Sequence, residues 1–186
     1  MTDKNLPTPD ELRKLLRYEP ETGRLFWRER SAKDYQHTKD PKRCAASFNA
    51  RDAGTPALTC INSWGYLSGA VWRRSLLAHR VIWAIVHGRW PEDEIDHING
   101  DKLDNRAENL RSVTGVANRR NMPTQANNTS GITGINRRGV SWIVRIGVGS
   151  RGKRLHIGSF KCFALALKSR KDAEAQYGYH RNHGRR

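Results

Sequence analysis

Four polar residues in the middle of the chain have types and spacings that could carry out a hydrolysis. Asp96 and His97 are adjacent, and Asn109 and Asn118 follow His97 by 12 and 21 positions. His97, with an ordinary pKa of about 6.5, is substantially neutral near pH 7 and can take a proton from water. The oxygens of Asp96 and Asn118 suit Mg²⁺ or Mn²⁺ better than zinc. A base and a cation that holds phosphate oxygens are what hydrolysis of a phosphodiester requires.

The charge of the chain points to nucleic acid as the partner. The 186 residues include 34 Lys or Arg and 18 Asp or Glu, a formal net charge of +16. Residues 1–108 carry 18 basic and 16 acidic side chains, whereas residues 109–186 carry 16 basic and two acidic ones. Each basic side chain that neutralises a phosphate releases counterions, so this field favours a polyanion. A basic surface kept only for solubility is the alternative.

An acidic cluster interrupts this basic background. Seven acids fall within seventeen residues: Glu92, Asp93, Glu94, Asp96, Asp101, Asp104 and Glu108. Carboxylates weaken the binding of a polyanion unless a hard divalent cation lies between them and the phosphates. A solvated acidic loop is the alternative, and it explains Glu92 to Glu94 better than it explains Asp96.

The local pattern predicts a strand, a turn, a second strand and a helix around these residues. We expect strands over 95–98 and 110–113, a turn at Asn99-Gly100, and a helix capped by Thr114 that runs through Asn118. Neighbouring strand residues point to opposite faces, so Asp96 and His97 can share a site only if the strand twists or ends there.

The series Asp96-His97, Asn109 and Asn118 resembles the HNH endonuclease motif, in the variant whose last His is Asn, over residues 77–121. The resemblance implies a ββα-metal nuclease in which His97 activates water and Asp96 and Asn118 hold one divalent metal, Mg²⁺ or Mn²⁺. It also implies that Asn109 pins the loop and orients His97. Three structural alternatives stay open: a buried structural His97, a turn-forming Asn109 and an ordinary helix residue Asn118. We expect His79 to be structural.

The last third of the chain predicts a second, groove-binding module. Strands are expected over 132–135, 141–148 and 154–158, and a helix over 163–177. Residues 130–177 resemble the AP2 DNA-binding domain, which implies a three-stranded antiparallel sheet laid in the major groove of duplex DNA. Strand alternation places Trp142, Val144 and Ile146 on the core face with Leu155 and Ile157 as partners.

The opposite face and several basic positions elsewhere are the candidate DNA contacts. They are Arg145, Arg154 and His156 on the sheet, Asn136, Arg137, Arg138 and Lys153 in or near its turns, and Arg73, Arg74, Arg119 and Arg120 outside it. Any single Arg among them could contact phosphate only, because half to two-thirds of protein–DNA hydrogen bonds go to the backbone.

The N-terminal half is predicted to hold a helix from Pro9 with a capping box at Thr8 and Glu11, and a strand over 24–30. A long loop is expected over 31–56. Residues 65–77 are expected to form two strands joined by a basic turn at Arg73-Arg74, and a helix is expected over 79–87. The predicted domains are an N-terminal region (1–60), a nuclease domain with its preceding hairpin and helix (61–121), a linker (122–130), an AP2-like domain (131–178) and a basic tail (179–186). Residues 180–186 of the tail are expected to be disordered.

The sequence therefore predicts an α+β protein that is a metal-dependent DNA endonuclease. The whole chain resembles phage HNH homing endonucleases with an AP2 tail, which implies an enzyme of the site-directed nicking or homing type, with double-strand cleavage left open. A DNA-binding regulator with an inactive HNH fold and an RNA-binding protein are the rivals. No apolar run approaches the roughly 18 residues of a membrane span, the first residues do not resemble a secretory signal, and Cys44, Cys60 and Cys162 form no close pair. We expect a cytoplasmic protein, a monomer with a dimer left open, and no small-molecule substrate.

Overall fold

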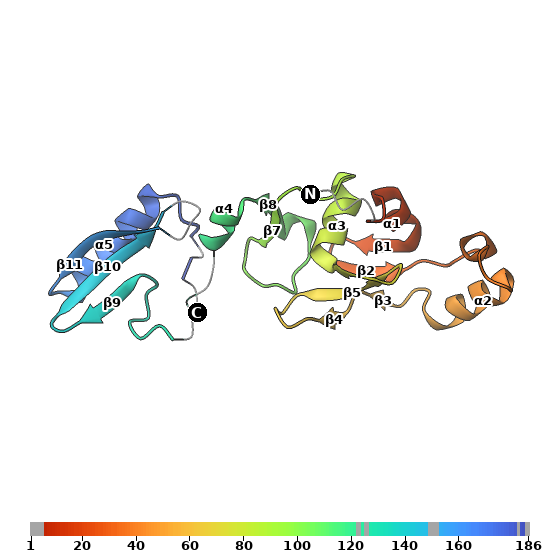
Figure 1. Ribbon diagram of the computed structural model, residues 1–186, viewed down its shortest axis with the longest axis horizontal. Helices are drawn as coiled ribbons and strands as arrows, with labels where there is room; N and C mark the ends of the chain where they lie inside the picture. The colour runs from red at the N-terminus through yellow and green to blue at the C-terminus, as the bar shows by residue number, and fades with distance from the viewer. Residues whose placement is uncertain (1–5, 122–123, 125–126, 149–152, 182, 185–186) are drawn as a thin grey trace. The chain divides into compact units, whose positions relative to one another are not determined.

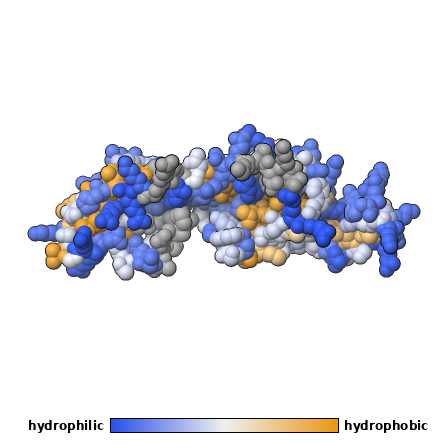
Figure 2. All heavy atoms as spheres, in the orientation of Figure 1, coloured by the Kyte–Doolittle hydropathy of each residue, from blue (hydrophilic) through white to orange (hydrophobic). Residues whose placement is uncertain are grey.

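The computed structural model describes residues 6–121, 124, 127–148, 153–181 and 183–184 (Figure 1). The chain forms two compact units. The first comprises residues 1–97 and 101–112, and the second comprises residues 98–100 and 113–186. Hydrophilic residues dominate the face seen in Figure 2. No helix in the described part of the chain is long and apolar enough to cross a membrane.

The first unit begins with the predicted helix, α1 (Pro9–Leu15), and its capping box is confirmed. The Thr8 amide donates to Glu11 Oε2 at 2.7 Å, and the Glu11 amide donates to Thr8 Oγ1 at 3.3 Å. A three-stranded sheet in the order β1-β2-β3 follows: β1 (Leu16–Glu19), β2 (Arg24–Trp27) and β3 (Pro56–Ala57). The expected strand over 24–30 thus ends three residues early.

The long loop predicted over 31–56 is wrong. This stretch contains a short 3₁₀ helix, η1 (Ala32–Tyr35), and a three-turn helix, α2 (Pro41–Arg51). The Asp40 carboxylate caps α2 by accepting from the Arg43 amide at 3.0 Å, and Pro41 occupies the first turn. Ala45 is the one buried residue of α2, so the apolar stripe that usually reveals a surface helix is missing.

A second sheet, in the order β4-β5-β6, leads into the helix before the Asp96-His97 segment. It consists of β4 (Cys60–Ile61), β5 (Leu67–Val71) and β6 (Arg74–Leu77), and α3 (Ala78–His87) follows and ends at Gly88 with φ of 69°. The β5–β6 turn lies at Trp72 and Arg73, one residue before its predicted place. Both residues have positive φ, 50° and 64°, which is costly for side chains of this size.

The segment that resembles the HNH motif, residues 77–121, has the predicted order of elements. β7 (Glu94–His97) and β8 (Leu110–Val113) form a two-stranded sheet, η2 (Ala107–Asn109) precedes β8, and α4 (Gly115–Arg119) follows it. β7 ends at His97. Asp96 and His97 can share a site only if the strand twists or ends there, so this requirement is met.

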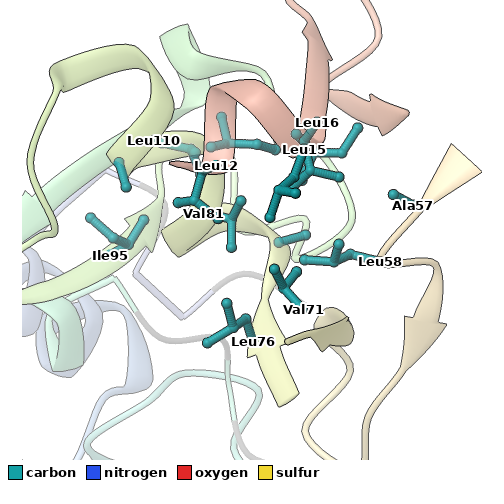
Figure 3. Close-up of a cluster of buried hydrophobic side chains, with 14 residues drawn as sticks. Leu12, Leu15, Leu16, Ala57, Leu58, Val71, Leu76, Val81, Ile95 and Leu110 are labelled. Atoms are coloured by element: carbon teal, nitrogen blue, oxygen red, sulfur yellow. The ribbon is translucent and has the colours of Figure 1, made fainter. Parts of the chain in front are cut away.

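One apolar core joins these elements of the first unit. Leu12, Leu15 and Leu16 come from α1 and β1, and they pack with side chains from β5, β6, α3, β7 and β8 (Figure 3). Those further residues include Val71, Leu76, Val81, Ile82, Ile95 and Leu110. The strands that carry the candidate site are therefore anchored through Ile95 and Leu110 to the same core as the N-terminal helix.

The second unit is a three-stranded antiparallel sheet packed on one helix, as predicted. The sheet order is β11-β10-β9, with β9 (Ile135–Arg138), β10 (Ser141–Gly147), β11 (Arg154–Phe160) and α5 (Phe163–Gln176). β9 covers residues 135–138, whereas a strand was expected over 132–135, so the two share only Ile135. Together the two units make the α+β class that the sequence predicts.

The core of the second unit confirms one predicted sheet face and corrects part of it. Val144 and Ile146 are buried, and Trp142 and Ile157 pack against the core cluster. Leu155, a predicted core partner, is 38% exposed. Leu155 pairs with the buried Ile146, so it lies on the predicted face, but on the edge strand β11 this position is less covered than Ile146 on the central strand β10.

The expected disorder of the C-terminal tail is wrong for its described residues. The Tyr179 hydroxyl donates to the Gly147 carbonyl at 2.9 Å, and the Tyr179 ring meets the His183 ring edge-to-face at 4.6 Å. The hydrogen bond ties Tyr179 to the end of β10, and His183 in the tail packs against Tyr179. Within the predicted linker, residues 122, 123, 125 and 126 lie outside the described residues, as do residues 182, 185 and 186 of the tail.

Candidate active site

His97 is the last residue of β7, and its ring is held by a buried amide. The side chain is 3% exposed, and Nε2 lies 3.0 Å from Asn105 Oδ1. An amide oxygen can only accept, so this hydrogen bond assigns the proton to Nε2 and makes Nδ1 the nitrogen able to receive one. The pair thus sets the tautomer that a general base needs.

Two rings form the walls around His97. The Tyr66 ring stacks at 5.8 Å and the His79 ring meets it edge-on at 5.2 Å. Burial lowers the pKa of His97, against the opposing effect of the Asn105 hydrogen bond. Burial also lowers the pKa of His79 to about 3, helped by the charge of His97. Both rings are therefore neutral near pH 7, which keeps His97 in its basic form.

The sequence predicts that Asn105 shapes the loop, and its hydrogen bond to His97 was not predicted. Its side chain is 1% exposed, and Nδ2 has no hydrogen-bond partner within the described part of the chain. No local sequence signal marks Asn105 as this partner, because its burial follows only from the tertiary structure.

The N-terminal sheet clamps the loop that carries Asn105. The Tyr18 hydroxyl accepts from the Ala107 amide at 2.8 Å and donates to the Asn105 carbonyl at 3.4 Å. A Cβ at Gly23, which has φ of 70°, would lie 2.5 Å from the Arg106 nitrogen. Only glycine allows this approach of the β1–β2 turn to the loop.

Asn109 fastens the same loop at its other end. Its side chain is 6% exposed, and Nδ2 donates to the Asp104 carbonyl at 2.8 Å. Its backbone amide donates to the Arg106 carbonyl at 2.9 Å. These two bonds close the segment 104–109, which includes Asn105. Asn109 therefore helps to position His97 indirectly, by holding the loop that carries Asn105.

Asp96 is buried and paired across the two-stranded sheet. It is 7% exposed, and Arg111 on β8 donates to Oδ2 through Nε at 2.9 Å and Nη2 at 2.7 Å. A buried carboxylate next to the base is suited to a cation. An ion bound there would share this carboxylate with the Arg111 guanidinium.

Asn118, the other predicted metal ligand, lies on α4 and is half-buried. It belongs to the second compact unit, whereas Asp96 belongs to the first. Among the described residues, no group of three or more His, Cys, Asp or Glu side chains could hold a metal ion. The donor set of one carboxylate and one amide oxygen fits Mg²⁺ or Mn²⁺ chemically.

The candidate DNA-binding residues fall into two groups on the C-terminal sheet. Asn136, Arg138, Arg145, Arg154 and His156 are exposed, and the register Arg145↔His156 and Gly147↔Arg154 places three of them on one face. Lys153 is exposed just before β11.

Arg137 belongs to the other group. It pairs with Trp142 and its guanidinium lies 5.5 Å from the centre of the Trp142 ring, which places Arg137 on the face opposite Arg145. The residues Asn136, Arg137 and Arg138 lie in β9 and not in a turn.

The other basic candidates lie away from that sheet face. Arg73 is exposed at the β5–β6 turn, and Arg74 begins β6. Arg119 is exposed at the end of α4, and Arg120 packs against the Tyr179 ring at 5.6 Å.

Comparison with known proteins identifies the nuclease segment. Residues 76–120 match the model of a family described as HNH endonuclease, which gives the chain an HNH endonuclease domain there. HNH endonucleases are phosphodiester hydrolases, so this domain is that of an enzyme. No curated protein and no solved structure matches the chain.

Proposed function

We propose that this protein is a metal-dependent DNA endonuclease that nicks duplex DNA at directed sites, in the manner of a homing enzyme. The observation that carries the proposal is the buried His97–Asn105 pair inside the segment that matches the HNH family. His97 Nδ1 takes the proton of the attacking water, while Asn105 holds Nε2–H and keeps the ring in place. The Tyr66 and His79 rings pack against the imidazole and help to fix its position.

Asp96 and Asn118 are the proposed ligands of one Mg²⁺ or Mn²⁺. A divalent cation bound there would neutralise charge on the phosphate and on the leaving oxygen. Asp96 brings the negative charge that attracts the ion, and Arg111 orients that carboxylate. The support is the chemistry of the two oxygen donors, and their convergence on one ion is part of the proposal. Asn109 serves as a positioning residue by closing the loop that carries Asn105.

The C-terminal sheet is the proposed DNA reader. Arg145, Arg154 and His156 form an exposed polar face over a separate apolar core, in a region of 78 residues with 16 basic and two acidic side chains. Arg side chains on a sheet face can bind phosphates and the edge of guanine in the major groove. The AP2-like use of this sheet and the domain boundary near 122–130 belong to the proposal.

A DNA-binding regulator without nuclease activity is the second candidate, and one contact favours it. Arg111 already binds the Asp96 carboxylate through two nitrogens. If this pair persists when DNA binds, the cation has weaker access to its charged ligand, and the protein would bind without cutting.

Incubation of supercoiled plasmid with Mg²⁺ or Mn²⁺ separates the two candidates. We expect nicking that stops with EDTA and falls about 10²- to 10⁴-fold in His97→Ala, the usual contribution of a general base. DNA binding should be retained by this variant. His87→Ala is the matched control, because His87 is exposed at the end of α3. Binding without nicking by the wild type would support the regulator.

A further inference from the structure

An exposed tryptophan projects from a rigid turn beside the active site. Trp64 lies between β4 and β5 and is 72% exposed. The Asn62 side-chain oxygen accepts from the amides of Trp64 and Tyr66, each at 3.0 Å, and the Gly65 amide donates to the Asn62 carbonyl at 2.9 Å. Gly65 has φ of 82°, a conformation that favours glycine. These hydrogen bonds fix the backbone of the turn, and the Trp64 indole is exposed to water.

Lys102 connects this turn to the nuclease loop. Its ammonium donates to the Trp64 carbonyl at 2.7 Å and lies 4.8 Å from the centre of the Tyr66 ring. Tyr66 in turn stacks on the His97 ring. Trp64 is thus two residues from a side chain that touches the proposed base, and a cation lies over the same turn.

We propose that Trp64 stacks on a base of the DNA next to the scissile phosphate and that Lys102 contacts the adjoining phosphate. This inference rests on the proposed function and adds to it the residues that hold the nucleotide beside the cut. An indole offers a flat apolar face that stacks on any base. An ammonium has three donors, of which the Trp64 carbonyl takes one, so Lys102 has donors for a phosphate oxygen.

The second exposed tryptophan of the same sheet provides the matched control. Trp72 is 53% exposed and lies at the other end of β5, six residues after Tyr66. At roughly 3.3 Å per strand residue, it is about 20 Å along the chain from Tyr66. Trp72 can therefore contact DNA only several base pairs away from the nucleotide that Trp64 would touch.

The test is a thermodynamic cycle on the full chain. The nick made by the wild type on plasmid is mapped, and duplex oligonucleotides are prepared with each base flanking the nick present or removed as an abasic site. Dissociation constants are measured in the His97→Ala background, which prevents cleavage, with Trp64 intact or changed to Ala. We expect Trp64→Ala to weaken binding about tenfold, which corresponds to about 1.4 kcal/mol.

The decisive result is non-additivity at one flanking position. There, removal of the base should weaken binding with Trp64 present and have no further effect in Trp64→Ala, because both changes remove the same stack. Trp64→Phe should keep most of the coupling, and Trp72→Ala should show none. The inference is overturned if removal of the base and Trp64→Ala weaken DNA binding independently at every flanking position. The proposed function still stands in that case, provided that the wild type nicks plasmid. If the wild type does not nick at all, both are overturned.

Discussion

The two units of this protein differ in where they keep their polar residues. In the nuclease segment Asp96, His97, Asn105 and Asn109 are each less than a tenth exposed. Asp96 is bonded to Arg111, His97 to Asn105, and Asn109 to the Asp104 carbonyl. On the C-terminal sheet Arg145, Arg154 and His156 are exposed. Chemistry on a phosphate needs a fixed geometry, which burial supplies, whereas attraction of a polyanion needs an accessible field. Substitutions in the first unit should therefore alter the rate of DNA cleavage, and substitutions in the second unit should alter DNA affinity.

The sharpest test of this contrast is the partner of the base. Asn105→Leu removes the acceptor for His97 Nε2–H, so we expect cleavage at saturating DNA to fall about 10- to 100-fold, as loss of one strong hydrogen bond predicts. Asn105→Asp can still accept and should retain more activity than Asn105→Leu. Single-turnover nicking and DNA affinity measured together would check this. Equal losses in the two variants, or a loss of affinity alone, would contradict a positioning role.

The opposite pattern is expected on the C-terminal sheet. The double variant Arg145→Ala with Arg154→Ala should weaken DNA binding and reduce the slope of log K against log salt by up to about two, one for each phosphate contact. The rate at saturating DNA should stay within about twofold of wild type. Binding titrations at several salt concentrations measure the slope. Arg51→Ala, at an exposed arginine of the first unit, is the control and should leave the salt slope unchanged.

The buried His79 predicts an acid limit to the stability of the first unit. Its pKa falls from 6.5 to about 3 on folding, so below pH 6.5 the unfolded chain binds more protons than the folded one. Stability is therefore complete above about pH 6.5 and declines as the pH falls towards 3. Thermal unfolding across that range should show a smaller decline in His79→Leu than in wild type. A parallel decline in the two proteins would assign the effect to other groups.

The smallest effect is expected where the two N-terminal strands support the loop. Tyr18→Phe removes the hydroxyl that bonds Ala107 and Asn105, which should lower the free energy of unfolding by about 1 kcal/mol. Cleavage should fall by only a few fold, because Asn109 still closes the loop. Denaturant unfolding with a nicking assay checks both. A loss as large as that of Asn105→Leu would show that the loop depends on Tyr18 more than on Asn109.

Local signals were sufficient for the elements that carry them. The capping box at Thr8, the helical spacing before Gly88 and the period-two pattern of residues 141–148 all predicted elements that the structure contains. The helix α2 was missed because it buries one alanine and has no apolar stripe. Leu155 lies on the predicted face but is 38% exposed, because alternation gives the face of a strand residue and not how well an edge strand is covered.

The sequence by itself determined the order of strand, loop, strand and helix in the nuclease segment, the class of fold and the uneven charge, because these depend on neighbours along the chain. Only the tertiary structure decided that Asn105 bonds His97, that Arg111 binds Asp96 across the sheet and that Tyr18 holds the loop. Contacts of this kind join residues 8 to 89 positions apart, and they form only when a shared core brings their strands together.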